Sequence, residues 1–340
     1  MFAEVMYTYR FDENRKNTIQ YSFANSIIER VRFCARLKTF SEVATSCKSF
    51  YGSNNMKKIG FIGVGIMGKS MVRNLMKAGF DLRIFARHRQ NVEDVISEGA
   101  VFCDSISDCV KGSDAVITIV GFPPDVEDVY FSPGKIMASA AKGTYLIDMT
   151  TTSPSLAERL YREGKAKGFH VIDAPVTGGD TGAKAGTLSI LAGGDKEDFE
   201  ACLPLFKAMG TNINYQGKAG NGQHAKMANQ ILIAGALSGV CEAFAYAKAK
   251  GLDLNVLLKS VATGAAGSKQ LDAFGPKLIA GDFAPGFKLK HFIKDMTLAD
   301  EEAKKAGLHL GVLEHVLENY EALEKEGLGE DGTQSLIKRY

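Results

Sequence analysis

Two hydrophobic patterns follow one another along the chain, and the change between them falls near Gly217. Upstream of it, short apolar runs alternate with segments whose apolar residues recur every three or four positions. The runs predict strands at 57–62, 81–85, 115–120, 145–148, 170–173 and 188–191, and the periodic segments predict helices at 66–77, 91–97 and 154–167. Strands that alternate with helices favour a parallel sheet covered by helices on both faces.

Downstream of Gly217 the pattern is helical. An Ala-, Leu- and Ile-rich stretch from 223 to 250 predicts one long helix, and further helices are expected at 254–262, 276–280, 289–305 and 310–325. We therefore predict an α/β parallel-sheet domain at 56–218 and an all-α domain at 219–340, joined by the long helix. Two domains also fit the length of 340 residues, at roughly 150 residues per domain.

Residues 1–55 fit neither pattern, and Met56-Lys57-Lys58-Ile59 resembles a natural protein start. We expect residues 1–55 to be a mis-assigned start or a poorly ordered extension. A transit peptide is the alternative, which frequent Arg and Ser favour and five acidic residues oppose. These residues hold eight Lys and Arg, so they account for the chain's net charge of +2. The remainder has no basic excess and gives no electrostatic reason to expect a nucleic-acid partner.

The composition is that of an ordinary globular protein, with 45% hydrophobic and 24% charged residues. Six cysteines form no CxxC pair and no zinc spacing, so we expect reduced thiols, a cytoplasmic location and no metal site. The longest apolar run, Ile231–Val240, is shorter than the about 20 residues that cross a bilayer. No membrane association is therefore expected.

Three glycines in the spacing GxGxxG lie between the first predicted strand and the first helix. Gly63 suits a tight turn, Gly65 lets the backbone approach a phosphate, and Gly68 permits close packing of the helix. The free amides at the helix start, those of Ile66 and Met67, would bind a pyrophosphate. We predict a Rossmann-type dinucleotide-binding domain; a glycine-rich turn without a ligand is the alternative.

The end of the second predicted strand bears on the choice between NAD and NADP. An NAD site usually has an acidic residue there, which binds the ribose hydroxyls. This chain has Arg87 and Arg89 instead, and either guanidinium could pair with a 2′-phosphate. We predict a preference for NADP over NAD, with a solvent-exposed basic turn as the alternative.

Two later segments contain candidate chemistry. The first, DAPVTGG at 173–179, follows a predicted strand and presents amides and a hydroxyl that suit a small anion. The second, GNGQHAKMANQ at 220–230, places Lys226 and Asn229 three residues apart, on one helix face. On these residues alone, an ordinary glycine-rich turn and a solvated lysine remain open as alternatives.

These three motifs, in this order, resemble the β-hydroxyacid dehydrogenase family, which includes 3-hydroxyisobutyrate dehydrogenase and tartronate semialdehyde reductase and is more distantly similar to 6-phosphogluconate dehydrogenase. The resemblance covers about residues 57–340 and includes Lys294-Asp295. It implies an NAD(P)-dependent oxidoreductase that oxidises a small 3-hydroxy acid or reduces the matching semialdehyde. It also implies a small-molecule carboxylate substrate and a homodimer or homotetramer.

The resemblance implies a role for each matching residue. Lys226 would be the general acid/base, and Asn229 would position it or the substrate. Oxidation needs the neutral amine of Lys226, and burial beside the nicotinamide, which is cationic when oxidised, should lower its pKa. The residues implied to bind substrate are Thr177, Gly178, Gly179, Thr151, Phe287 and Asp295. The residues implied to bind the cofactor are Gly63, Gly65, Ile66, Met67, Gly68, Arg87, Arg89, Phe122, Pro123, Thr151 and Lys294.

Two departures and several alternatives stand beside this interpretation. Thr177 replaces a common Ser, and Gln230 replaces a second Asn, as in the tartronate-reductase-like branch. A tartronate semialdehyde or glyoxylate reductase is one alternative. Imine reductases and non-catalytic dinucleotide-binding scaffolds tend to lack the lysine, so Lys226 opposes both. A phosphogluconate-type decarboxylating enzyme needs a larger helical domain than this chain provides.

Overall fold

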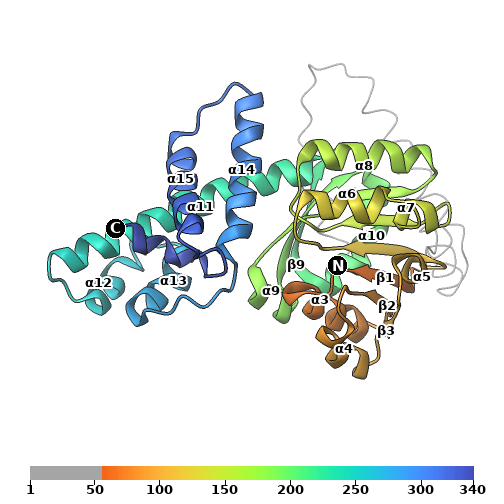
Figure 1. The fold of residues 1–340 in the computed structure, drawn as a ribbon, viewed down its shortest axis with the longest axis horizontal. Helices are drawn as coiled ribbons and strands as arrows, with labels where there is room; N and C mark the ends of the chain where they lie inside the picture. Colours follow the sequence, from red (N-terminus) through yellow and green to blue (C-terminus); the bar gives the residue numbers. More distant parts are fainter. Residues whose placement is uncertain (1–55) are drawn as a thin grey trace, which may run out of the picture. The chain divides into compact units, whose positions relative to one another are not determined.

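The computed structural model describes residues 56–340, and the interpretations of residues 1–55 lie outside this part. In the described chain, the first half forms a nine-stranded sheet in the order β3-β2-β1-β4-β5-β6-β8-β7, with β9 paired to β8. Figure 1 shows the sheet between its helices. The strands are β1 (Lys58–Ile62), β2 (Asp81–Phe85), β3 (Val101–Phe102), β4 (Ala115–Thr118), β5 (Tyr145–Asp148), β6 (His170–Asp173), β7 (Val176–Thr177), β8 (Leu188–Gly194) and β9 (Gly210–Gly217).

Strands β1 to β6 pair in parallel, as the alternating pattern predicts. Strand β8 departs from the prediction, because it runs antiparallel to both β6 and β7. Only residues 178–187 separate β7 from β8, whereas a parallel crossover takes a dozen residues or more. The parallel part of the sheet is the part that carries the GxGxxG loop.

Helices cover both faces of this sheet, and alternate residues of the central strands face opposite layers. Ile117 and Ile147 pack on the side of α3 and α10, and Val116 and Leu146 pack on the side of α6 and α8. The helical segments of this half are α3 (Ile66–Lys77), η1 (Arg89–Asn91), α4 (Glu93–Ser97), α5 (Ile106–Val110), α6 (Pro123–Phe131), α7 (Ile136–Ser139), α8 (Pro154–Ala166), α9 (Gly179–Ala185) and α10 (Lys196–Met209).

The second half consists of helices packed around α11 (Figure 1). They are α11 (Asn221–Ala249), α12 (Leu254–Val261), α13 (Lys269–Ala280), α14 (Leu289–Lys305), α15 (Gly311–Lys325) and η2 (Thr333–Arg339). Leu237 and Cys241 of α11 share a core with Phe292 of α14 and Tyr320 of α15. Near its start, α11 instead contacts β8 and β9, so this single helix belongs to both halves, as the sequence predicts.

Helix α11 contains the run Ile231–Val240, from which no membrane association was predicted, and is much longer than that run. Its 29 residues contain an 18-residue window of mean hydropathy 1.4, so by length and composition alone it could cross a membrane. Of that window, 44% is buried inside the protein, against α13, α14 and α15. We interpret α11 as a core helix, because the same length and hydropathy occur in the central helices of soluble proteins.

The largest error in a predicted helix boundary is at the start of α13. Helix α13 begins at Lys269, not at Pro276, because Ser268 caps it by accepting a hydrogen bond from the Leu271 amide at 3.1 Å. Pro276 then lies inside the helix. The cap could have been recognised, since a serine before an apolar periodic segment is a typical helix start.

Candidate functional site

The GxGxxG loop connects β1 to α3. Gly63 adopts φ +97°, and a Cβ at this position would overlap the carbonyl oxygen of Ile119. A Cβ at Gly68 would overlap the carbonyl oxygen of Gly63. In contrast, a Cβ at Gly65 would meet no described atom within 4 Å, so the space beside Gly65 is open. Gly65 is also the N-cap of α3 and caps no amide, which leaves the amides of Ile66 and Met67 for an anion.

The turn after β2 carries Arg87 and Arg89, and the Gly63 amide bonds the Phe85 carbonyl at 3.3 Å. This bond places the turn beside the GxGxxG loop. Arg89 is already engaged, because its Nε lies 3.0 Å from Glu93 Oε1 and its guanidinium lies over Phe102. The Arg87 side chain is 81% exposed, and Asp125, 3.9 Å away, is its ion-pair partner. Arg87 is therefore the more available of the two.

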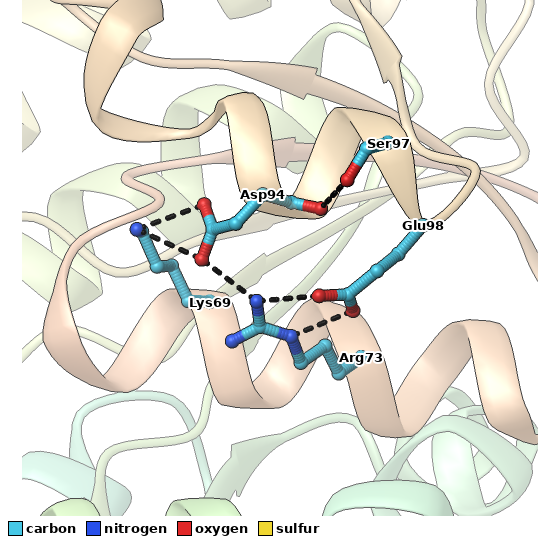
Figure 2. A network of polar contacts seen from close by, with 5 residues as sticks. All are labelled: Lys69, Arg73, Asp94, Ser97 and Glu98. Atoms are coloured by element: carbon cyan, nitrogen blue, oxygen red, sulfur yellow. Dashed lines mark hydrogen bonds and ion pairs between the residues drawn. The ribbon is translucent and has the colours of Figure 1, made fainter.

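A charged network holds α4, which follows this turn, against α3 (Figure 2). Lys69 Nζ lies 2.9 Å from Asp94, and Arg73 bonds both Asp94 and Glu98 at 2.7 Å. The bond from Lys69, and then that from Arg73, lower the pKa of Asp94 to about 2. These pairs lie on the surface, so they position α4 more than they stabilise the fold.

The loop Thr150–Thr152, after β5, is held by side chains of the helical half. Gln223, with 0% exposed, donates from Nε2 to the Thr150 carbonyl at 2.8 Å and accepts the Thr152 amide at 3.0 Å. Lys294 Nζ donates to the Thr151 carbonyl at 2.5 Å. Three neighbouring backbone groups are thus bonded by α11 and α14. We call Thr150–Thr152, with Gln223 and Lys294, the clamped loop.

Two buried aspartates lie at the ends of the strands beneath the clamped loop. Asp173 accepts the amides of Gly220 and Gln223, at 2.8 and 3.0 Å, and so anchors the start of α11. Asp148 accepts from the Thr118 hydroxyl and the Thr150 amide, at 2.8 and 3.1 Å. Burial raises the pKa of Asp173 to about 7 and that of Asp148 to about 6.

Lys226 lies buried beside a charged pair of α14. Only 7% of it is exposed, and residues 56–340 offer its Nζ no hydrogen-bond partner. Burial lowers its pKa to about 8. The negative charge of Asp295 opposes this shift, and the positive charge of Lys294 adds to it. Lys294 and Asp295 form an ion pair at 2.8 Å. Asn229 is linked to Asp295 through Gln230.

A second contact between the halves is aromatic. Phe122, the N-cap residue before Pro123 in α6, lies 5.0 Å from His291 of α14, measured between ring centroids. His291 in turn stacks with Phe287 at 6.5 Å. Burial, and then Lys294 and Lys290, lower the pKa of His291. This histidine lies between Phe122 and Phe287, so the three rings form one aromatic row.

The turn Thr177–Gly179 lies at the end of β7 and the start of α9. Thr177 is half-buried, while Gly178 and Gly179 are exposed, with φ of +130° and +65°. The loop before α14 reaches this turn, since a Cβ at Gly286 would lie 3.5 Å from Asp180 Oδ1. Direct contacts join Thr151, Lys294 and Asp295, whereas Arg87 and Arg89 lie apart, beside the GxGxxG loop.

Cysteines and metal ligands add nothing to this site. Cys103, Cys109, Cys202 and Cys241 are free and buried, and Cys34 and Cys47 lie outside the described residues. Within 56–340 no three His, Cys, Asp or Glu side chains are arranged to hold a metal ion.

Each half of the chain matches the model of a known protein domain. Residues 58–217 match the model of the NAD-binding domain of 6-phosphogluconate dehydrogenase, and residues 220–340 match the NAD-binding domain of NADP-dependent 3-hydroxyisobutyrate dehydrogenase. The chain belongs to the β-hydroxyacid dehydrogenase family. As a member of this family it is an NAD(P)-dependent oxidoreductase with a nicotinamide dinucleotide cofactor.

Relatives of this dehydrogenase align with it over most of its length. An uncharacterised oxidoreductase of Bacillus subtilis, YkwC, is 48% identical over 83% of this chain and 98% of its own. A probable mitochondrial 3-hydroxyisobutyrate dehydrogenase-like protein of Arabidopsis thaliana is 43% identical over 82% of this chain and 84% of its own. The structure of Mycobacterium tuberculosis 3-hydroxyisobutyrate dehydrogenase with L-serine has TM-score 0.76 and 27% identity, and covers 84% of this chain and 99% of that one.

Several buried polar residues of this dehydrogenase were not identified from the sequence. Gln223, Asp173 and Asp148 bond partners far away in sequence, so spacing does not show their contacts. One signal was readable, because Asp148 and Asp173 each end an apolar strand of a parallel sheet, where ligands bind. His291 gave no such signal.

Proposed function

We propose that this dehydrogenase transfers a hydride between nicotinamide and a small 3-hydroxy acid, or the matching semialdehyde, with Lys226 as general acid/base. The observation that carries the proposal is the burial of Lys226 beside Asp295 and Lys294, which brings its pKa to about 8. Near that pH the neutral and protonated amine are both populated, so one residue can serve both directions.

In the proposed mechanism, a bound nicotinamide would accept the hydride during oxidation and donate it during reduction. Neutral Lys226 takes the proton of the substrate hydroxyl during oxidation, and its ammonium returns a proton to the carbonyl oxygen during reduction. Thr177, with the amides of Gly178 and Gly179, holds the carboxylate. Asn229 positions Lys226 or the substrate, and Thr151, Phe287 and Asp295 line the substrate position.

For the cofactor, we propose that Arg87 pairs with a 2′-phosphate, which favours NADP over NAD. Its exposure beside the GxGxxG loop supports this role, whereas Arg89 is engaged with Glu93. Gly63, Gly65, Gly68 and the amides of Ile66 and Met67 would hold the pyrophosphate. Phe122, Pro123 and Lys294 would complete the nicotinamide side of the site.

A tartronate semialdehyde or glyoxylate reductase is the second candidate, favoured by Gln230, which this chain shares with that branch. We also propose a homodimer or homotetramer. The exposed Leu232 and Tyr246, 75% and 65% accessible, support it because they lie on one face of α11. A cytoplasmic location and the domain limits 56–218 and 219–340 stay predictions.

The function is tested with Lys226→Met in the full-length protein. We expect turnover of the best semialdehyde or hydroxy acid in a panel to fall by about a thousandfold, since acid–base groups contribute roughly 10²- to 10⁴-fold. NADPH binding, followed by nicotinamide fluorescence, should change little. Lys218→Met, at an exposed lysine before α11, is the matched control. Normal turnover of Lys226→Met would falsify the proposed role.

A further inference from the structure

Asp295, Gln230 and Asn229 form a chain of side-chain hydrogen bonds next to Lys226. Gln230 Nε2 donates to Asp295 Oδ2 at 2.6 Å, and Asn229 Nδ2 donates to Gln230 Oε1 at 2.7 Å. Gln230 and Asp295 are 1% and 2% exposed. We call these three residues the amide relay.

The carboxylate of Asp295 sets the direction of the amide relay. A carboxylate offers only acceptor atoms, so the NH₂ group of Gln230 must face Asp295. The carbonyl oxygen of Gln230 therefore faces Asn229, and it too can only accept. Asn229 must then turn its own NH₂ group toward Gln230. The oxygen and nitrogen atoms of a side-chain amide have nearly the same shape, so shape alone does not orient it. The hydrogen-bond network orients the amides of Gln230 and Asn229.

The amide relay leaves the carbonyl oxygen of Asn229 for a ligand. Within the described chain, Asn229 Oδ1 has no hydrogen-bond partner. Asn229 is half-buried and follows Lys226 by three residues in α11, so the two side chains share a helix face. The site therefore presents a hydrogen-bond acceptor one helical turn away from the acid/base.

This acceptor matters for substrate choice, in a step that rests on the proposed function. If the carboxylate at C1 binds Thr177–Gly179 and the oxygen at C3 binds Lys226, the remaining substituent is the one on C2. An acceptor beside C2 stabilises a hydroxyl or ammonium group and offers nothing to a hydrogen atom or a methyl group. We propose that Gln230 is a specificity-determining residue, which acts through Asn229 to favour 3-hydroxy acids with a hydrogen-bond donor on C2.

The test compares glycerate, as each enantiomer, with 3-hydroxypropionate, because these substrates differ only in the hydroxyl on C2. Wild-type protein should oxidise the better glycerate enantiomer with a kcat/KM about tenfold higher, the difference that one hydrogen bond supplies. In Gln230→Leu, the relay is broken and the preference should fall to about twofold or less. The kcat/KM for 3-hydroxypropionate should fall less than that for glycerate, so the ratio of the two values is the measured outcome.

A second variant separates orientation from packing. In Gln230→Glu at neutral pH, two carboxylates face each other without a donor, so their repulsion should move the substituted side chain away from Asp295, release Asn229 and remove the preference for glycerate. Protonation at lower pH restores one donor between them, and the preference should return as the pH falls. Gln334→Glu is the matched control. Gln334 is 0% exposed and donates to the carbonyls of Asp282 and Ala284, so its substitution should leave substrate choice unchanged.

The role of Gln230 would be overturned by equal losses for both substrates in Gln230→Leu, or by a wild-type protein that does not prefer glycerate. A preference in Gln230→Glu that ignores pH also contradicts it. These outcomes differ from failure of the proposed function, in which wild-type protein would oxidise no hydroxy acid and reduce no semialdehyde with either cofactor.

Discussion

Thr151 and Arg87 both follow strands of the same parallel sheet, yet their surroundings differ. Around Thr151, Gln223 and Lys294 bond the backbone from two helices, and Asp148 lies buried beneath. Around Arg87, the charged side chains are exposed and pair mainly with one another. Buried polar groups are costly to leave unpaired, whereas exposed ion pairs contribute little. The clamped loop should therefore tolerate substitution poorly, and the Arg87 turn should tolerate it well.

Among the substitutions that test this difference between the two regions, Gln223→Leu should have the largest effect. The substitution leaves the Thr150 carbonyl and the Thr152 amide without their partner in a buried position. We expect the free energy of unfolding to fall by about 2–4 kcal/mol, since each unsatisfied buried group costs roughly 1–3 kcal/mol. Chemical denaturation measures it. Gln216→Leu, at a half-buried glutamine before α11, is the control and should change stability little.

A smaller effect is expected from Arg87→Ala, and it should appear in cofactor choice, not in stability. Loss of one charge-assisted bond to a 2′-phosphate should raise the KM for NADPH by about tenfold and leave that for NADH unchanged. Arg89→Ala should act less strongly, because Arg89 already pairs with Glu93. Lys77→Ala, at the far end of α3, controls for the lost charge. Equal changes for NADPH and NADH would contradict the NADP proposal.

The two regions also differ in how much the sequence could predict. The GxGxxG loop, α3 and β2 were predicted with their observed limits, because a local pattern of glycines and apolar residues defines them. Helix α8 begins at Pro154, as predicted, because the Ser153 hydroxyl accepts the Leu156 amide at 3.2 Å. Local signals suffice where the chain folds on itself within a few residues.

Elements decided by tertiary contacts were missed. The sequence offers a glycine-rich turn at 173–179 and predicts no helix after it, yet residues 179–185 form α9, which packs on α3 and bonds Asn74 through the Ala183 carbonyl at 2.7 Å. Helix α10 contains Pro204 and was not predicted, and β9 is an exposed polar strand without an apolar alternation. The same holds at the site, since Lys226 belongs to a motif, whereas the roles of Gln223 and Gln230 depend on distant partners.

The central claim is that buried Lys226 is the group that exchanges the substrate proton, and the pH dependence of kcat/KM tests it most directly. A pKa lowered to about 8 means that hydroxy-acid oxidation should rise with pH through a midpoint near 8, as Lys226 loses its proton. Reduction of the semialdehyde should fall through the same midpoint, because it needs the ammonium form. Opposite profiles that cross near this pH would support the account. A midpoint near the ordinary lysine value of about 10.4, or profiles without a transition in this range, would contradict it.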